Sequence, residues 1–273
     1  MERPEQPQEI ADRLLAAWDR TTTTASISST TPAFGQEDAY EVLDLIAARR
    51  RTDGWQSVGR KIGFTNRSIW EAFGVKAPMW AHLWDRTVVH TTAPMVTLSL
   101  DAYVQPRIEP EVVLGLSAPM PTMADASEVM RRVGWIAAGF EIVHCHFPDW
   151  EFALADATAD FGLHGALVLG PPLVVDDANR EHLTAALATF EATLARDGAV
   201  VDRGRGANVL GSPAIALAHL AQVIAADDRH PPLGAGEIVT TGTITAAWPI
   251  AAGQTWTSHY GALGLSGLTL TLS

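Results

Sequence analysis

Cysteine is nearly absent from this chain, which excludes two kinds of protein. Cys145 is the single cysteine among 273 residues, so neither an intramolecular disulfide framework nor a CxxC metal site can form. A small scaffold held together by disulfides is therefore excluded. The reducing cytoplasm is the compartment that we expect for such a chain.

Long apolar runs are also missing. The opening residues, MERPEQPQEI, contain no apolar core of signal-peptide length. No uninterrupted apolar run approaches the roughly 20 residues that a membrane-spanning helix needs. We therefore expect a soluble protein without a membrane partner.

Basic residues are scarce: 19 Lys and Arg face 31 Asp and Glu, which gives a net charge of −12. An acidic surface repels phosphate backbones, and only the arginines at 49–51 form a basic cluster. Nucleic acid is therefore not an expected partner. The acidic excess is explained either by a solvated surface or, in part, by a carboxylate site that holds a divalent cation.

The composition supports a globular core, since 47% of the residues are apolar and 18% are charged. Apolar residues at helical spacing predict a first helix around Ile10–Trp18 and a second over 37–51, with acids at its start and bases at its end. The Ser/Thr-rich stretch 21–31 between them is typical of a loop.

Short extended runs, broken by Gly and Pro, dominate the rest of the chain. We expect strands at 56–64, 87–90, 107–116, 165–169 and 173–176, a hairpin over 185–203 that turns at Asp197-Gly198, and further strands from 238. Helices are expected at 124–138 and from Ser212-Pro213 onward. Because helices come first along the chain and strands dominate later, the sequence predicts an α+β fold with a twisted, barrel- or roll-like core. We divide the chain into a helical segment, 1–55, and one β-rich catalytic unit, 56–273.

Two glutamates in the segment RIEPEVVL are the first candidate site residues. Residues i and i+2 of a strand project from the same face, so Glu109 and Glu111 are expected side by side. If that face is buried, the two anions need a positive partner, and a hard divalent cation with oxygen ligands satisfies them. The alternative is an exposed edge strand that is marked by Pro110.

A third glutamate favours the metal site. Glu141 lies in the apolar segment GFEIV and is therefore expected to be buried. Together with the first two carboxylates it would complete an oxygen triad suited to Mg²⁺ or Mn²⁺. His144 and His146 could suggest zinc, but without a cysteine cluster or an HExxH pattern we interpret them as hydrogen-bonding residues around the site.

Lys61 is a candidate for proton transfer. It lies between glycines and apolar residues in GRKIGFT, where burial would lower its pKa. A nearby carboxylate triad would oppose that shift, so the local sequence leaves the net sign open. A lysine at the end of a strand in solvent is the alternative.

Several segments together resemble a known family. Five segments are similar, in this order, to the blocks of 2-keto-4-pentenoate hydratases and 4-oxalocrotonate decarboxylases. They are KIGFT, RIEPEVVLGL, GFEIVHCHFPDW, ANVLGSPAIALAHLA and AGEIVTTGTITAAWPIAAGQTWTSHYGALG. These enzymes belong to the fumarylacetoacetate hydrolase superfamily. The similarity runs from about Gly59 to the C-terminus, with a weaker helical match before it.

The resemblance implies a mixed β-roll and a homo-oligomeric, cytoplasmic enzyme of aromatic-compound catabolism. It implies one Mg²⁺ or Mn²⁺ held by Glu109, Glu111 and Glu141, with Lys61 pointing into the site. It also implies that the block around Thr243 and Thr245 meets the carboxylate of the substrate.

The chain departs from the family pattern at two places. Hydratases of this family commonly carry Pro-Asp-Phe-Gly after the position of Gly74-Val75, whereas this chain has an apolar residue, Met79, in place of the acid. Further on, Phe161, Leu163 and His164 stand where polar residues are common. We therefore expect Met79 and Phe161 to line an aromatic, less acidic substrate pocket.

A small 2-oxo acid is the expected substrate, because it can chelate the cation through its keto and carboxylate oxygens. The cation would stabilise the enolate that forms during a bond change at C3. A hydratase is the first hypothesis, with Lys61 as general acid and base. The alternatives are a decarboxylase of a 2-oxo diacid, a C–C bond hydrolase with His82 or His164 as the base, and a metal-binding homologue without activity.

Overall fold

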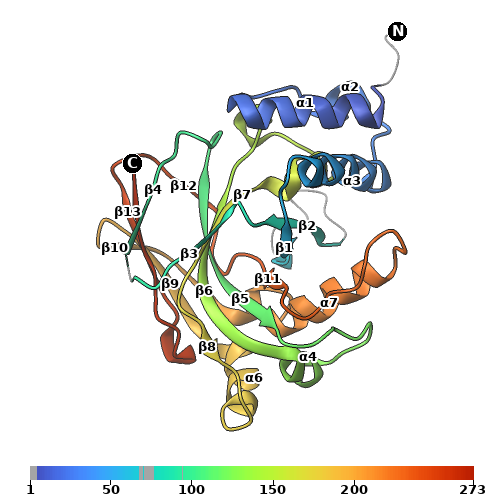
Figure 1. Cartoon of the computed structure of the whole chain (residues 1–273). Helices are drawn as coiled ribbons and strands as arrows, with labels where there is room; N and C mark the ends of the chain where they lie inside the picture. Colours follow the sequence, from blue (N-terminus) through green and yellow to red (C-terminus); the bar gives the residue numbers. More distant parts are fainter. Residues whose placement is uncertain (1–4, 68–69, 71–76, 94) are drawn as a thin grey trace.

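Three helices open the chain and lie together over one end of the molecule (Figure 1). The computed structural model describes residues 5–67, 70, 77–93 and 95–273. The helices are α1 (Pro7–Arg20), α2 (Ile27–Thr30) and α3 (Gln36–Thr52). The two helices expected from periodicity are confirmed, because the apolar faces of α1 and α3 pack against each other. The stretch 21–31 is not entirely a loop, since it contains the short helix α2.

A large twisted sheet carries the site. Its strands run in the order β2 (Met79–Trp84), β1 (Ser57–Gly63), β11 (Ile238–Thr240), β5 (Arg107–Leu116), β6 (Val133–Val143), β7 (His164–Leu169) and β3 (Val88–His90), with β12 (Trp248–Pro249) on β5 and β8 (Leu173–Val174) on β6. The antiparallel pair of β5 and β6 is the longest in it, and its register places Glu109 opposite Glu141.

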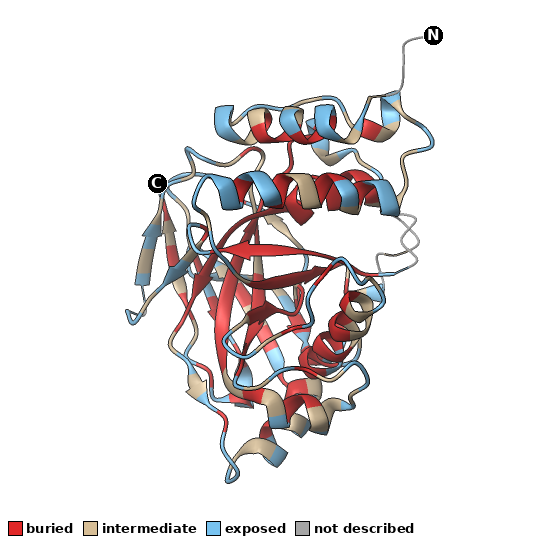
Figure 2. Cartoon of the chain, turned by 45° about the vertical axis from the view of Figure 1, so that its right-hand side comes forward, coloured by how far each residue is buried: buried red, intermediate tan, exposed pale blue. Residues whose placement is uncertain are grey.

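A second sheet packs against the first and closes the roll. It contains β10 (Ala199–Arg205), β9 (Glu191–Arg196), β13 (Thr255–His259), β14 (Thr269–Leu272) and β4 (Met95–Leu98) in spatial order. Helices α4 (Ala126–Arg132), α6 (Arg180–Thr189) and α7 (Pro213–Ala225) cover one side. Short helical turns connect these elements: η2 (Pro148–Trp150), α5 (Leu154–Ala159), η3 (Phe161–Leu163), η4 (Gly206–Asn208) and η5 (Gly261–Leu263). Figure 2 shows that most buried residues lie in the strands and on the helix faces that pack inward.

The expected α+β roll with helices at its N-terminus is confirmed, whereas two element boundaries are wrong. The helix expected at 124–138 ends at Arg132, because the chain from Val133 onward pairs with β5 as a strand. The hairpin turns at Asp197-Gly198 as expected, but residues 185–189 belong to helix α6. Alanine favours helix, and in residues 185–189 this preference outweighed the alternation of apolar residues that had indicated a strand. The division at residue 55 stays a prediction.

Helix α7 is the most apolar helix in the described part of the chain. Ser212 caps it as expected, since its side chain accepts a hydrogen bond from the Ile215 amide at 3.2 Å. By length and hydropathy alone, Gly206–Ala225 could cross a membrane, yet 56% of this stretch is buried inside the protein. Its buried residues belong to the main hydrophobic core, which is the ordinary setting of such a helix.

Candidate metal centre and active site

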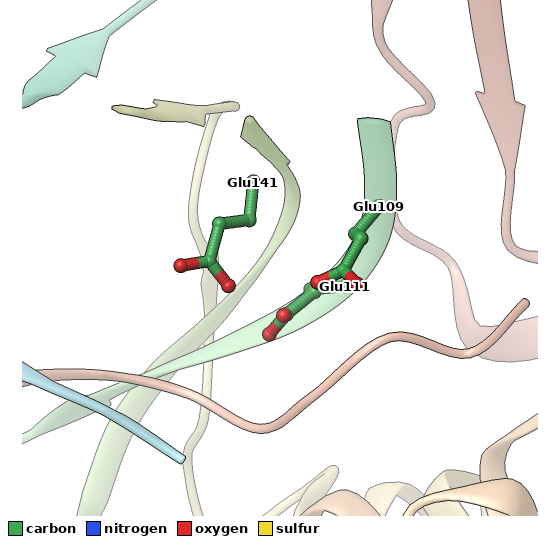
Figure 3. Close-up of side chains that lie close together, drawn as sticks. All are labelled: Glu109, Glu111 and Glu141. Atoms are coloured by element: carbon green, nitrogen blue, oxygen red, sulfur yellow. The ribbon is translucent and has the colours of Figure 1, made fainter. Parts of the chain in front are cut away.

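Three glutamates from two neighbouring strands converge at one point. Glu109 and Glu111 project from one face of β5, and Glu141 reaches the same place from β6 (Figure 3). Each offers a carboxylate oxygen within 4.8 Å of the others. Glu111 and Glu141 are completely buried and Glu109 is half-buried. The exposed edge-strand alternative is therefore wrong, because β5 is a central strand whose glutamates face inward.

The carboxylates have free oxygens that suit a cation. Glu111 accepts one hydrogen bond, from the Gly242 amide at 2.8 Å. Its other oxygen, and one oxygen of Glu141, are buried without a hydrogen-bond partner among the described residues. Buried anions without partners are costly, and an all-oxygen donor set is what Mg²⁺ and Mn²⁺ prefer. The residues therefore fit a divalent cation.

The pKa values of the three carboxyl groups are split by their surroundings. Burial raises the pKa of Glu109 to about 7, and burial together with the neighbouring carboxylates raises the pKa of Glu111 well above its usual range. Burial also opposes ionisation of Glu141, but the charge of Lys61 and the hydrogen bond with His164 outweigh it and hold its pKa to about 2. The metal-free site therefore keeps protons near neutral pH.

This proton content predicts a pH-dependent metal affinity. A cation must displace the protons from Glu109 and Glu111, so Mg²⁺ affinity should fall by at least about tenfold per pH unit below pH 7 and should continue to rise above it, because the pKa of Glu111 is raised as well. Calorimetric titration with Mg²⁺ from about pH 5.5 to pH 8.5 would measure this slope. The Glu109→Gln variant serves as the control, because it should bind more weakly and show a shallower slope. An affinity that does not change across this range would contradict the prediction.

Lys61 lies beside the carboxylates and is buried. Its ammonium donates a hydrogen bond to the Gly162 carbonyl at 2.9 Å and lies 3.2 Å from an oxygen of Glu141. Burial alone would lower the pKa of Lys61, but the three carboxylates outweigh burial and raise it. The structure settles the sign that the sequence left open: in the metal-free site Lys61 is a cation with a proton to donate. The solvent-exposed alternative is wrong.

Met79 packs beside Lys61 and lines the cavity. A Cβ on Gly63 would come within 2.8 Å of the Met79 methyl group, and one on Gly162 within 3.5 Å of Lys61. Gly162 also has a positive φ of 61°. Gly63 thus makes room for the Met79 methyl group, and Gly162 makes room for Ala81, whose Cβ would lie 2.6 Å from the added atom. Met79 is where the sequence placed it, on the wall beside Lys61.

Phe161 occupies a different place from the one expected. Its ring lies 4.5 Å from that of Trp18 on α1, outside the cavity, while Gly162 and Leu163 line it. Phe161, Gly162 and Leu163 all have positive φ angles, so the chain turns sharply and carries the Phe161 ring away from the glutamates. Phe161 therefore does not line this cavity, contrary to the position expected for it, and its contact with a substrate stays a prediction.

The histidines surround the site without entering the cavity. Both ring nitrogens of His164 are engaged, with Glu141 at 2.8 Å and with Thr87 at 2.9 Å. His82 lies on the other face of β2 from Met79, shares a hydrogen bond with Ser57 at 3.1 Å, and has a pKa lowered to about 3, chiefly by burial. His164 is thus placed to orient Glu141, whereas His82 is not part of the lining of the cavity at the glutamates.

His144 and His146 are buried together under α1. His146 shares a hydrogen bond of 2.6 Å with Asp160, and His144 lies near the Val104 amide. Trp18 packs against both rings. Neither histidine is in the carboxylate cluster that could hold a metal, in agreement with their interpretation as hydrogen-bonding residues.

A cavity of about 380 Å³ opens onto Glu109 and Glu111. Its lining includes Thr243 and Thr245, as expected from the C-terminal block, and also Thr65, whose buried hydroxyl has no hydrogen-bond partner among the described residues. Arg107 and Trp150 complete another part of the wall, with the guanidinium 3.9 Å from the ring centre. The sequence reasoning missed both. Arg107 could have been found, because it stands at i−2 from Glu109 on the same strand face.

The chain belongs to the fumarylacetoacetate hydrolase family: the family model described as "Fumarylacetoacetate (FAA) hydrolase C-terminal" matches residues 71–267. The resemblance seen in the sequence is thereby confirmed. The chain is 32% identical, over 96% of both chains, to a 2-keto-4-pentenoate hydratase of Burkholderia vietnamiensis. It is 30% identical to a 4-oxalocrotonate decarboxylase of Pseudomonas sp. (strain CF600), over 82% of this chain and 81% of that protein.

A solved structure has the same fold over the whole chain. It is the 4-oxalocrotonate decarboxylase of Pseudomonas putida G7 complexed with magnesium and adipate, with a TM-score of 0.87 and 24% sequence identity. The match covers 100% of this chain and 99% of that one. The fold derived from the strands above is therefore that of the family.

Proposed function

We propose that this protein is a Mg²⁺- or Mn²⁺-dependent lyase that acts on a small 2-oxo acid or its enol as a hydratase. The observation that carries the proposal is the convergence of Glu109, Glu111 and Glu141 beside Lys61 at the base of a cavity. The similarity to 2-keto-4-pentenoate hydratases over nearly the whole chain supports the hydratase type.

The three glutamates would hold the cation, and His164 would keep Glu141 oriented through its ring hydrogen bond. When bound, the cation would polarise the 2-oxo group of the substrate. Lys61 would then donate a proton to the carbon chain of the substrate or accept one from it, since its ammonium is buried at the cavity wall.

The remaining wall would position the substrate. The wall includes Thr243 and Thr245, which follow Gly242 along the chain as it runs beside β5 from Glu111 past Pro110. The family resemblance supports a contact of this segment with the carboxylate next to the 2-oxo group, for which the Thr243 and Thr245 hydroxyls would turn from the Thr245 and Ala246 carbonyls to which they donate. Ile62, Val143 and Leu163 provide an apolar wall that limits the access of water.

A decarboxylase of a 2-oxo diacid is the second candidate, and Met79 is the observation that favours it. Met79 is apolar and supplies no acid for the addition of water, whereas loss of CO₂ depends mainly on electron withdrawal by the cation. Hydrolytic C–C cleavage has less support, because His82 lies away from the cavity and both ring nitrogens of His164 are occupied.

Turnover of a panel of candidate substrates, with and without Mg²⁺, tests the proposal. The panel contains 2-hydroxypentadienoate, 4-oxalocrotonate, oxaloacetate and an acylpyruvate. Metal-dependent hydration of the dienoate supports the hydratase, and release of CO₂ from 4-oxalocrotonate supports the decarboxylase instead. Metal binding without turnover of any member would identify a non-catalytic homologue.

The family similarity also supports a proposal on compartment, assembly and pathway. We expect a cytoplasmic homo-oligomer that takes part in the degradation of aromatic compounds. Light scattering after gel filtration would measure the oligomeric state, and a monomer at micromolar concentration would contradict this part of the proposal.

Substitution of Met79 tests the part played by the apolar wall. The Met79→Asp variant should hydrate the dienoate faster, by about tenfold, because it supplies a second proton-transfer group next to Lys61. Product ratios and kcat would be measured for both reactions. Met79→Leu is the matched control and should behave as the natural protein does. If a folded Met79→Asp variant hydrates no faster than the Met79→Leu variant, Met79 does not limit hydration.

A further inference from the structure

Arg107 is a cation on the cavity wall that the proposed chemistry does not use. It lies on the same face of β5 as Glu109 and Glu111, at the beginning of the strand. Its guanidinium makes no hydrogen bond or ion pair with the described residues. It packs instead on the face of Trp150, 3.9 Å from the ring centre.

The support for Arg107 is held in place by Gln105. The carbonyl of Gln105 accepts a hydrogen bond from the Trp150 indole at 3.0 Å, and its side chain accepts one from the Asp149 amide at 2.8 Å. The same side chain donates to the carbonyls of Cys145 and Phe147 at 3.0 and 2.8 Å. These bonds tie the turn at 145–150 to the start of β5, so the indole plane is preorganised beside Arg107.

The backbone of this region is strained. Gln105, Asp149 and Trp150 have positive φ angles of 49°, 59° and 61°. Such angles are unfavourable for residues with a side chain and persist only where the surroundings enforce them, often at ligand sites. The strain here has one visible result, which is the position of Trp150 against the guanidinium.

Arg107 and Gly242 mark opposite ends of the glutamate row. Gly242 contacts Glu111, and Arg107 lies beyond Glu109 at the other end of the strand face. A spacing of two strand residues places the Cα atoms of Arg107 and Glu109 about 7 Å apart. Val143 and Ala247 line the same cavity and provide apolar surface there. This arrangement suits a short carbon chain with a charged group at each end.

We propose that Arg107 binds the second, distal carboxylate of a linear 2-oxo dicarboxylate. Stacking on Trp150 occupies one face of the guanidinium and leaves its edge, with its hydrogen-bond donors, for a carboxylate. The inference rests on the proposed function, because it assumes that the 2-oxo end is held at the glutamates. It makes Arg107 the residue that selects diacids over monoacids.

The test compares the binding of matched inert ligands to the Mg²⁺-loaded protein. The diacids 2-oxoglutarate, 2-oxoadipate and 2-oxopimelate are titrated by calorimetry beside 2-oxopentanoate, 2-oxohexanoate and 2-oxoheptanoate. The natural protein should bind at least one diacid about 10- to 100-fold more tightly than its monoacid, as a charge-assisted bidentate contact allows. The Arg107→Gln variant should lose this preference, with monoacid affinity changed by less than about threefold.

Two controls separate this contact from other effects. Arg107→Lys keeps the charge but loses the planar fork, so it should retain only part of the preference. Arg196→Gln, which alters an arginine beside Trp256 on the second sheet, should change neither class of ligand. Equal loss of monoacid and diacid binding in the Arg107→Gln variant would overturn the inference, since Arg107 would then act only as a general counter-charge to the glutamates.

The outcomes distinguish the inference from the proposed function. Diacid selectivity that depends on Arg107, without turnover of any 2-oxo acid, would contradict the lyase and leave the inference standing. Turnover together with a missing diacid preference in the natural protein would overturn the inference and leave the lyase standing.

Discussion

Replacement of Glu111 by Gln should weaken Mg²⁺ binding by at least about a hundredfold, because it removes one of three anionic ligands from a buried site. The amide oxygen of glutamine can still accept the hydrogen bond from Gly242, so the local backbone should be retained. Calorimetry with Mg²⁺ and Mn²⁺ would measure the loss. Binding within about threefold of the natural protein would show that Glu111 is not a ligand.

The stability of the same variant should change in the opposite direction. Burial and neighbouring carboxylates raise the pKa of Glu111, so its ionised form is unfavourable in the metal-free protein. The Glu111→Gln variant should therefore melt at a higher temperature than the natural protein when both are metal-free at about pH 8. Added Mg²⁺ should stabilise the natural protein and leave the variant nearly unchanged. Glu128→Gln, which removes a half-buried carboxylate on α4 that is ion-paired with Arg131 and Arg132, is the control and should not affect metal binding.

Replacement of Lys61 by Met should lower kcat by at least about a hundredfold, because it keeps side-chain bulk and removes the proton donor. Metal affinity should not fall, since the substitution removes a cation that lies 3.2 Å from Glu141. Initial rates on the substrate that the panel identifies would provide kcat, and calorimetry would provide the metal affinity.

Arg60→Met is the matched control for this experiment. Arg60 is the preceding buried cation on β1, but it is ion-paired with Glu237 and is not part of the cavity lining. Its loss should lower stability without a comparable effect on kcat. Near-normal kcat in a folded Lys61→Met variant would make Lys61 structural and return the proton-transfer role to His164, the histidine that contacts Glu141.

The central features of the fold could be predicted from local patterns. The strand Arg107–Leu116 was predicted with the bounds that the structure has, because its apolar run is bounded by turn residues and is long enough to pair along its whole length. The expected continuation of the helix from residue 133 to residue 138 was wrong. Val133–Val143 contains two glycines and several β-branched and aromatic residues, which favour strand, and its pairing with β5 along its length confirms that it is one. That pairing joins distant segments, which a local pattern does not report.

The sequence by itself determined which residues could make a metal site. The i, i+2 spacing of Glu109 and Glu111 allows only one strand face for both, and the apolar neighbours of Glu141 predicted its burial. Tertiary structure decided what surrounds that site. The register of β5 with β6 placed Glu141 opposite Glu109, and the left-handed turn at Phe161 carried that ring away from the cavity. Tertiary structure also decided the direction in which the pKa of Lys61 is shifted. Burial lowers this pKa and the three carboxylates raise it, and their distances from Lys61 depend on the fold.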